Sequence, residues 1–392
     1  MRALLGTALT AALVTAVGLV PPSASARETD AGHARRAAGV TLVGNGYGHG
    51  HGLSQWGAQY AAGKGLSHQK ILAFYYPGLK KGSVGGAVKV LITADTSTDV
   101  MVKDRSGLKV RSLGNGKVYR LTKNAVWWRI LPDQRGKRSA IQYRGSRGGW
   151  KVFRTVAGEA QFDAGGSPIT LHTPAGNVAY RGVLRSAAPS ASSGKRDTVN
   201  ILPLESYLKG VVPREVPAQW HPAAVRAQAV AARTYAAFER REPLARHYQI
   251  CDTSSCQVYG GYSSEQPESN RAVAATKKYV LLAGGKPAFA QFSASNGGYT
   301  SAGAVSYLPA KRDPYDKAYR NWHATVSAQT IEAALPAIGA FRSVDVTERD
   351  GKGAFGGRVV QIKVVGSSGT ATLTGDEFRS YFGLMSTMFD EA

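Results

Sequence analysis

Residues 202–240 read LPLESYLKGVVPREVPAQWHPAAVRAQAVAARTYAAFER, and their second half predicts the helix around which the chain folds. Pro222 suits the first helical position, because a proline there gives up no intrahelical hydrogen bond. The residues that follow are mostly small and apolar, and a helix that is apolar on all sides is a buried one. Arg226 and Arg233 interrupt this run on one side of the helix. Because a buried charge is costly without a partner, we expect a carboxylate, a row of carbonyl groups or a bound anion beside them.

Glu215 is the only acidic residue in the interval 206–238, and Pro213 and Pro217 flank it. The two prolines restrict the backbone on both sides of the glutamate. A lone carboxylate on a stiffened turn before a buried helix is a candidate general acid or base. A solvated loop glutamate, or a partner for Arg214, is the alternative interpretation, and the spacing alone leaves both open.

Three motifs resemble the SpoIID/LytB family of bacterial cell-wall proteins: YLKGVVPREVPAQWHPAAVRAQAVAARTYA, CDTSSCQVYGG and FSASNGGYT, in this order. The sporulation member of that family is a lytic transglycosylase that cleaves peptidoglycan glycan strands. The resemblance implies that Glu215 is the catalytic residue and that Arg233 also serves catalysis, either by ordering the glutamate or by holding a substrate oxygen. It further implies that the loop containing Ser293, Ser295 and Asn296 lies beside the glutamate and binds glycan.

A glycine-rich segment at residues 42–78 reads LVGNGYGHGHGLSQWGAQYAAGKGLSHQKILAFYYPG. His49 and His51 project from one face of an extended chain. Such a pair can begin a metal site, but no third ligand is near, so substrate or backbone hydrogen bonding is preferred. We predict that both histidines and Gln55 bind substrate, and that short helices cover residues 54–62 and 67–76.

The same segment resembles the GHG-x-GMSQ signature of the family, which most relatives carry at the C-terminal end of the domain. Here it comes first, so the resemblance implies a circular permutation. The expected contact is between residues 41–56 and the strands near 341–373. A separate N-terminal module is the alternative, but no second copy of the signature follows.

Residues 1–26 are typical of a secretory signal peptide, with Arg2, an apolar stretch from 3 to 20 and the small-residue site Ala24-Ser25-Ala26. An uncleaved anchor is the alternative. No other stretch approaches the roughly 20 apolar residues that a membrane span needs. We therefore predict a secreted or cell-wall protein without a stable membrane span once the signal is removed.

The chain has 49 Lys and Arg against 26 Asp and Glu, a formal charge of +23. Inside a cell this balance would suggest nucleic-acid binding. The basic residues are scattered, however, without an RNA-binding signature or a helix-turn-helix pattern. For an exported protein we predict retention by anionic wall polymers and no nucleic-acid partner.

Cys251 and Cys256 are the only cysteines. In an exported chain the natural interpretation is a disulfide. Some family members bind zinc here through two cysteines and a nearby histidine. His247 is available, but Ser254 and Ser255 stand where relatives often carry a histidine, which disfavours zinc. We predict a disulfide, no metal ion and no cofactor.

The expected fold is α+β, a SpoIID-like core with a buried Ala-rich helix and a β-rich lobe that shares a sheet with the core. Short β-rich runs separated by Gly, Asn, Asp and Pro predict the lobe. The predicted organisation is as follows: signal peptide 1–26, disordered linker 27–40, GHG segment completing the core 41–80, β-rich lobe 84–198, catalytic core 199–325, and C-terminal α/β part 326–392.

The resemblance predicts a lytic transglycosylase that cleaves between N-acetylmuramic acid (MurNAc) and N-acetylglucosamine (GlcNAc) with a single Glu acid/base, giving 1,6-anhydroMurNAc. Hydrolysis would ordinarily need two carboxylates, and no second candidate stands out. The alternative is a non-catalytic wall-binding protein that enhances an N-acetylmuramoyl-L-alanine amidase, as the LytB relatives are named to do. A cell-wall amidase is therefore a second expected partner beside the glycan strands.

Overall fold

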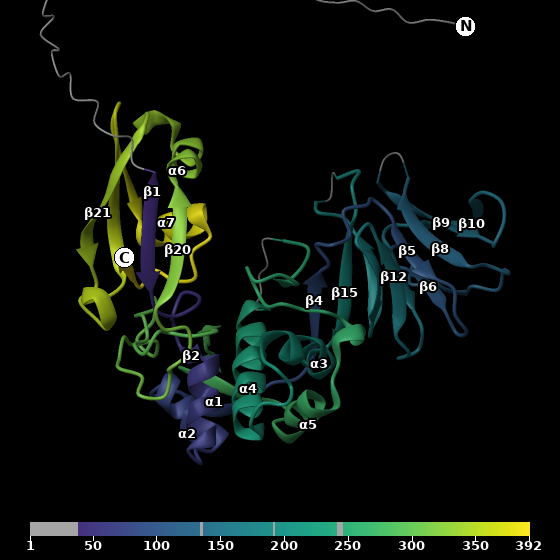
Figure 1. Ribbon diagram of the computed structural model, residues 1–392. Helices are drawn as coiled ribbons and strands as arrows, with labels where there is room; N and C mark the ends of the chain where they lie inside the picture. Colours follow the sequence, from purple (N-terminus) through teal and green to yellow (C-terminus); the bar gives the residue numbers. More distant parts are fainter. Residues whose placement is uncertain (1–37, 134–135, 191–192, 241–245) are drawn as a thin grey trace, which may run out of the picture. The chain divides into compact units, whose positions relative to one another are not determined.

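Residues 38–133, 136–190, 193–240 and 246–392 are described by the computed structural model, and together they form a mixed α+β protein (Figure 1). The predicted signal peptide and nearly all of the predicted linker lie outside the described residues. Strand β1 begins at Gly39, two residues before the linker was expected to end. Among the described residues, no helix is both long enough and apolar enough to cross a membrane.

Helix α4 (Pro222–Glu239) lies at the centre of the chain's packing and begins at the predicted proline. The imidazole Nδ1 of His221 accepts the backbone N–H of Ala223 and caps the helix. One face of α4 packs in a hydrophobic core with helices α1 and α2. The other face packs in a second core with helices α3 and α5 and the β-rich lobe. Small side chains allow these close approaches on both sides of one helix.

Four further helices surround α4 in these two cores (Figure 1). Serine side chains cap the first two: Ser54 accepts the N–H of Gly57, and Ser67 accepts the N–H of Lys70. The four are α1 (Gln55–Gly63), α2 (His68–Tyr75), α3 (Leu204–Glu215) and α5 (Pro267–Ala275). Two small sheets accompany them: β18 (Lys286–Pro287), β17 (Tyr279–Ala283) and β3 (Lys80–Ser83), and the parallel pair β19 (Phe292–Ser293) and β2 (Leu53–Ser54).

The β-rich lobe contains two sheets whose inner faces share a core with α3 and α4. The first is ordered β16 (Ile250–Cys251), β4 (Ala87–Leu91), β15 (Asp197–Pro203), β14 (Val183–Ala187), β11 (Ala160–Asp163), β6 (Lys109–Ser112) and β7 (Val118–Arg120). The second is ordered β10 (Lys151–Ala157), β9 (Arg138–Arg144), β8 (Trp127–Pro132), β5 (Val100–Lys103), β12 (Ile169–Thr173) and β13 (Gly176–Tyr180). Because β16 comes after α4, the lobe shares a sheet with the later chain, as predicted.

The C-terminal part packs around a third core. Its elements are β20 (Trp322–Ser327), α6 (Ala328–Ala334), β21 (Phe341–Arg349), β22 (Val359–Gly366), β23 (Thr370–Thr374), α7 (Gly375–Phe382) and β24 (Phe389–Glu391). Strands β21, β22 and β23 form one antiparallel sheet. Helix α7 opens with a capping box, in which Thr374 and Glu377 satisfy each other's backbone N–H groups.

Strand β1 (Gly39–Gly44) joins this C-terminal part, although it is the first strand of the chain (Figure 1). It lies between β20 and β24 and pairs antiparallel with both. The contact expected between residues 41–56 and the strands near 341–373 is present, since β1 contacts β21, while the backbone pairing of β1 is with β20 and β24. Side chains of β1 do pack with those of β21 and β22 in the third core. The circular permutation itself stays a prediction.

Candidate functional site

A groove of about 640 Å³ surrounds Glu215. Segments far apart in the sequence form its walls: the GHG segment, the end of α3, α4, the Cys251–Cys256 loop, β19 and α7. Its lining residues are Tyr47, Gly48, His49, Gln55, Arg214, Glu215, Tyr235, Ser254, Ser255, Cys256, Val258, Gln291, Phe292, Ser293, Ala294 and Arg379. Among the described residues that line it, Glu215 is the only carboxylate.

Glu215 is the last residue of α3 and does not stand on a separate turn, because the helix continues through Pro213. Its carboxylate is held by two donors from different segments. Oε1 accepts the backbone N–H of Val258 at 2.9 Å, and Oε2 accepts the Nε2–H of Gln55 at 3.3 Å. Burial raises the pKa of Glu215, and the two hydrogen bonds and the Arg214 charge oppose that shift without cancelling it. The group therefore keeps its proton to a higher pH than an exposed glutamate does.

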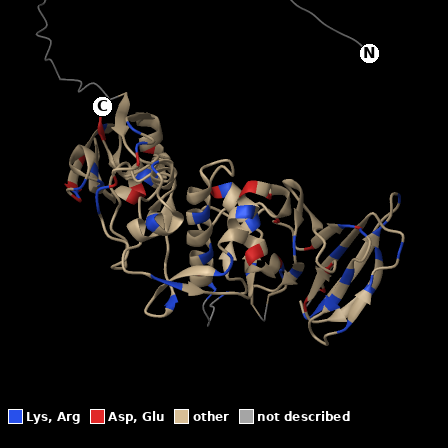
Figure 2. Cartoon of the chain, turned by 90° about the horizontal axis from the view of Figure 1, so that it is seen from below, with Lys and Arg blue, Asp and Glu red and all other residues tan. Residues whose placement is uncertain are grey.

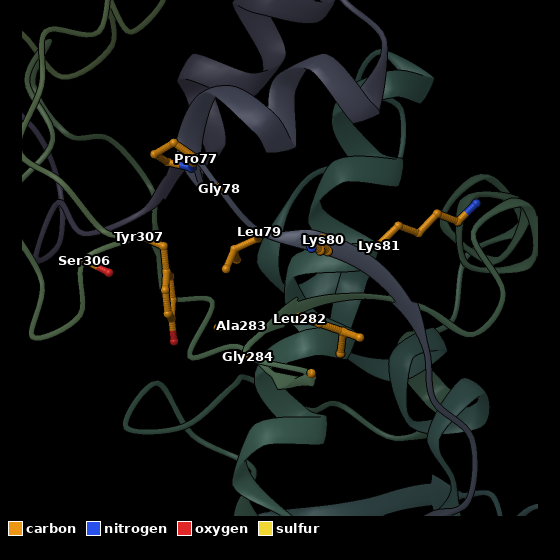
Figure 3. A pocket seen from close by; sticks show the side chains of 11 residues that line it. Pro77, Gly78, Leu79, Lys80, Lys81, Leu282, Ala283, Gly284, Ser306 and Tyr307 are labelled. Carbon is orange, nitrogen blue, oxygen red and sulfur yellow. The ribbon is translucent and has the colours of Figure 1, made fainter.

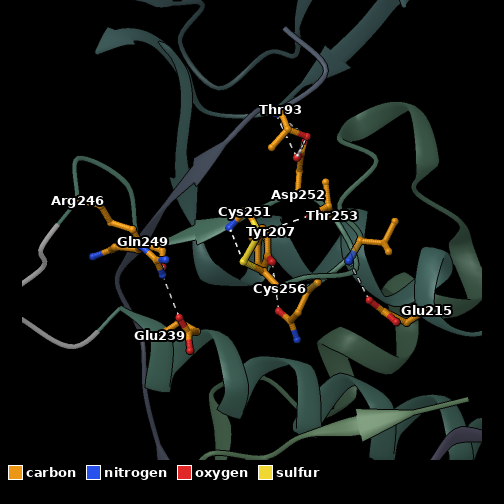
Figure 4. Close-up of a disulfide and its surroundings, with 12 residues drawn as sticks. Thr93, Tyr207, Glu215, Glu239, Arg246, Gln249, Cys251, Asp252, Thr253 and Cys256 are labelled. Carbon is orange, nitrogen blue, oxygen red and sulfur yellow. Dashed lines mark hydrogen bonds and ion pairs between the residues drawn. A yellow bond between two sulfur atoms is a disulfide. The ribbon is translucent and has the colours of Figure 1, made fainter. Parts of the chain in front are cut away.

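Two interactions restrain the loop that precedes Val258, whose backbone N–H donates to Glu215. Figure 4 shows this loop with its disulfide. Cys251 and Cys256 form a disulfide two residues before Val258. The Asp252 carboxylate accepts both the backbone N–H and the hydroxyl of Thr93 on the lobe. The covalent tie and the Asp252–Thr93 bonds together restrict the backbone that donates to Glu215. The predicted disulfide is therefore present, and it restrains the loop that donates to Glu215.

His49 lines the groove as a neutral imidazole. Burial lowers its pKa to about 3, and the neighbouring charges of Arg379 and Arg358 act in the same direction. Its Nδ1 accepts the backbone N–H of His51 at 3.0 Å, so the proton sits on Nε2. The two rings stack with centroids 4.9 Å apart. Within the part of the chain that the structure describes, no group of three His, Cys, Asp or Glu side chains could hold a metal ion.

The structure brings three of the predicted substrate-binding residues into the groove: His49, Gln55 and Ser293. Gln55 is largely buried, since only 7% of its surface is exposed, and its side-chain amide donates to Glu215. Ser293 accepts the backbone N–H of Gly50 through its hydroxyl, so part of its capacity is used to hold the GHG segment.

The prediction that Ser295 and Asn296 bind glycan is wrong, because both side chains are fully enclosed by protein. The Ser295 hydroxyl donates to the Asp316 carboxylate, and the Asn296 amide donates to the Asp313 carboxylate at 2.7 Å. These bonds fix the loop. His51 also lies outside the groove lining, with its Nδ1 3.3 Å from the carbonyl oxygen of Ser301.

Arg233 is not a groove residue either, and its predicted contact with substrate is corrected by its burial. Its side chain has no exposed surface and forms a two-bond ion pair with Glu205, both bonds being 2.9 Å. It also donates to the carbonyl oxygens of Ala229, Val273 and Tyr279. Both the carboxylate and the carbonyl row expected for this arginine are present. Arg233 therefore acts on Glu215 only by holding α3, which carries both glutamates.

Arg226, the second arginine of α4, differs from Arg233. Its Nε is buried and, within the described residues, has no hydrogen-bond partner. It lines a hollow of about 250 Å³ together with Trp220, Glu268 and Arg271. The partner expected for this side chain is therefore not seen at its Nε.

Sequence reasoning missed several lining residues. Most of them lie inside the quoted motifs or the glycine-rich segment but were not predicted to bind substrate: Tyr47, Arg214, Tyr235, Ser254, Ser255, Val258, Phe292 and Ala294. Arg379 comes from α7, outside every motif, so no local signal pointed to it.

A hollow of about 460 Å³ between residues 77–81 and 282–285 is lined by Leu79, Lys80, Leu282 and Tyr307 among others, without a carboxylate (Figure 3). Lys and Arg occur on the β-rich lobe, on the central helices and on the C-terminal part (Figure 2). The groove with Glu215 is thus the strongest candidate for a reactive site.

Comparison with known proteins agrees with the motif resemblance. Residues 192–282, which include Glu215, match the family model SpoIID, Stage II sporulation protein. Over 147 residues the chain is 40% identical to the amidase enhancer of Bacillus subtilis (strain 168), covering 36% of this chain and 19% of that protein.

Two relatives carry the name Stage II sporulation protein D. The one from Bacillus subtilis (strain 168) is 29% identical over 221 residues, covering 49% of this chain and 61% of the relative. The one from Bacillus amyloliquefaciens is 28% identical over 222 residues, covering 50% and 58%. The chain thus matches between 19% and 61% of the length of these three curated relatives.

Proposed function

We propose that this chain is a lytic transglycosylase acting on peptidoglycan glycan strands, and the match of residues 192–282 to the SpoIID family model supports the proposal. The observation that carries the proposal is the setting of Glu215. It is the one carboxylate among the described lining residues of a sugar-sized groove, it is held by two donors, and its pKa is raised. A carboxyl group of this kind suits general acid catalysis near neutral pH.

The reaction needs one group that gives a proton and then takes one. Protonated Glu215 donates to the glycosidic oxygen between MurNAc C1 and GlcNAc O4, and the C1–O4 bond breaks. The 6-hydroxyl of the same MurNAc then bonds to C1 and passes its proton to the Glu215 carboxylate. The products are a 1,6-anhydroMurNAc end and a free GlcNAc 4-hydroxyl, and the catalyst is regenerated. No water is consumed, so a second carboxylate to activate water is not required.

Neighbouring residues support this cycle by orientation. Gln55 donates to one carboxylate oxygen of Glu215 and the Val258 amide donates to the other, so the two donors fix the orientation of the carboxylate in the groove. His49 is neutral and carries its proton on Nε2, so this side chain adds no positive charge to the groove wall.

The setting of the enzyme follows from the same proposal. The predicted export signal and the basic charge of +23 suit a protein held among anionic wall polymers outside the membrane. The glycan strand is the proposed substrate. No cofactor or metal ion takes part in the proposed steps.

A non-enzymatic role is the second candidate, favoured by the relative named amidase enhancer, which has the highest identity of the three reported. In that role the groove would bind the strand, and a separate N-acetylmuramoyl-L-alanine amidase would act on it. Glu215 would then serve as a hydrogen-bond acceptor for sugar hydroxyl groups.

Product mass spectrometry separates the two candidates. The protein is incubated with purified glycan strands, with and without stem peptides, alone and together with a cell-wall amidase. Transglycosylase activity predicts 1,6-anhydroMurNAc ends from the protein alone on at least one strand type. An enhancer predicts intact strands from the protein alone and faster release of stem peptides only when the amidase is present.

A further inference from the structure

Four partly exposed aromatic rings form a continuous series that leaves the groove, and we name Tyr47, Tyr319, Trp56 and Trp220 the aromatic row. The ring centroids of Tyr47 and Tyr319 are 5.2 Å apart, those of Tyr319 and Trp56 are 6.4 Å apart, and those of Trp56 and Trp220 are 4.7 Å apart. Each pair meets edge to face. An edge-to-face contact uses only one face of one ring, so other ring faces stay available for a ligand.

The aromatic row begins at the reactive groove. Tyr47 lines the groove itself. Trp56 directly follows Gln55, whose amide donates to Glu215. At the other end, Trp220 lines the separate hollow of about 250 Å³ beside α4 and α5. A chain-like ligand that leaves the groove past Tyr47 would meet the other three rings in turn.

Core packing does not account for these rings. Tyr47 is 45% exposed and Tyr319 is 37% exposed. Tyr47, Trp56 and Tyr319 belong to none of the three hydrophobic cores of the described residues, and Trp220 only packs at the edge of one. Large aromatic side chains left in water by a folded protein usually mark a surface that binds something.

The position of Tyr319 is held at a conformational cost. Its φ is +49°, a region that side chains other than glycine rarely adopt. Its carbonyl oxygen accepts the N–H of Gly46 at 2.8 Å, and the Asn321 N–H donates to Asn45 Oδ1 at 2.8 Å. These bonds tie both sides of Tyr319 to the GHG segment. Strained backbone that the surroundings enforce is concentrated at functional sites.

We propose that the aromatic row is a saccharide-binding track that continues the Glu215 groove and holds sugar rings of the strand beyond the cleavage point. The four rings offer flat apolar faces, which suit the ring faces of a glycan. Aromatic faces pack against the C–H face of a sugar ring, while phenol and indole groups offer hydrogen bonds to its hydroxyls. This inference rests on the proposed function, because it takes the glycan as the ligand of the groove.

Binding measurements on the full chain test the track. The Glu215→Gln protein is used so that no strand is cut, and its Kd is measured by calorimetry for a GlcNAc–MurNAc tetrasaccharide and octasaccharide. We expect the octasaccharide to bind about tenfold more tightly, since it alone can reach several rings of the row. Adding Tyr319→Leu or Trp220→Leu should remove most of this gain and leave tetrasaccharide binding unchanged.

The control is Tyr381→Leu on α7, a 55% exposed tyrosine outside the aromatic row, which should keep the full gain. The proposal is overturned if the gain survives Tyr319→Leu and Trp220→Leu, or if the octasaccharide shows no gain at all. Should either variant unfold, the other gives the same test, because neither residue lines the groove. A wild-type protein that makes no anhydro product but shows the ring-dependent gain would refute transglycosylation and leave the track standing.

Discussion

Replacing Arg233 by methionine should destabilise the protein while leaving the chemistry of the groove intact. The guanidinium has no exposed surface. It connects α4 with α3 through Glu205, and with α5 and β17 through the carbonyl oxygens of Val273 and Tyr279. Methionine fills much of the same space but offers no donor. Within the described residues, the Glu205 carboxylate would then keep the backbone N–H of Lys278, at 3.0 Å.

The magnitude follows from the burial of the pair. Removing one partner of a buried ion pair typically costs about 3–5 kcal/mol, because the other charge is left without compensation. For a chain of this size a loss of about 1 kcal/mol lowers Tm by roughly 2 °C, so we expect Tm to fall by about 6–10 °C. Glu205→Gln should cost somewhat less, because the Glu205 side chain is 24% exposed and water can reach it.

Differential scanning calorimetry and product formation at a temperature well below the new Tm are the two measurements. Arg271→Met is the matched control, because Arg271 forms an exposed i,i+3 pair with Glu268 on α5 and should leave Tm nearly unchanged. We expect Arg233→Met to keep near-normal kcat once it is folded. A variant with wild-type Tm and abolished activity would refute this reasoning and return Arg233 to the chemistry.

Four further outcomes are expected at the groove. Because the proton on Glu215 starts the reaction and burial raises its pKa, activity should fall as pH rises through that raised pKa, as a pH–rate profile would show. Gln55→Met removes a donor that stabilises the carboxylate, so the alkaline fall should move to higher pH. Because the pKa of His49 is about 3, His49 does not change its charge between pH 5 and 8. The His49→Gln variant should therefore show a pH–rate profile of the same shape as wild type in that range. Reduction of Cys251–Cys256 should lower Tm and activity together, measured with and without dithiothreitol, because the loop that donates to the carboxylate is freed.

Local sequence signals predicted the helices well. Pro222 and the small apolar residues after it predicted the start and the burial of α4, and the helices expected over residues 54–62 and 67–76 are present as α1 and α2. These features depend on residues that are near one another in the sequence, so the sequence alone contains the information.

Long-range placement was predicted less well. Motif resemblance could not tell that Ser295 and Asn296 face the protein interior, because their partners Asp313 and Asp316 lie in a segment without any motif. Burial of an arginine was foreseen from the helix pattern, yet its partner Glu205 was not, since that pairing depends on how α3 packs on α4. Groove walls built from six distant segments follow from tertiary packing alone.

The central claim is that Glu215 breaks the glycosidic bond, and mass spectrometry of its Gln variant tests this most directly. Purified glycan strands are incubated with wild type, with Glu215→Gln and with Glu268→Gln, a matched change at an exposed glutamate on α5. We predict 1,6-anhydroMurNAc ends from wild type and from Glu268→Gln, and none from Glu215→Gln that keeps wild-type Tm and strand binding. Anhydro ends released by folded Glu215→Gln at the wild-type rate would contradict the account.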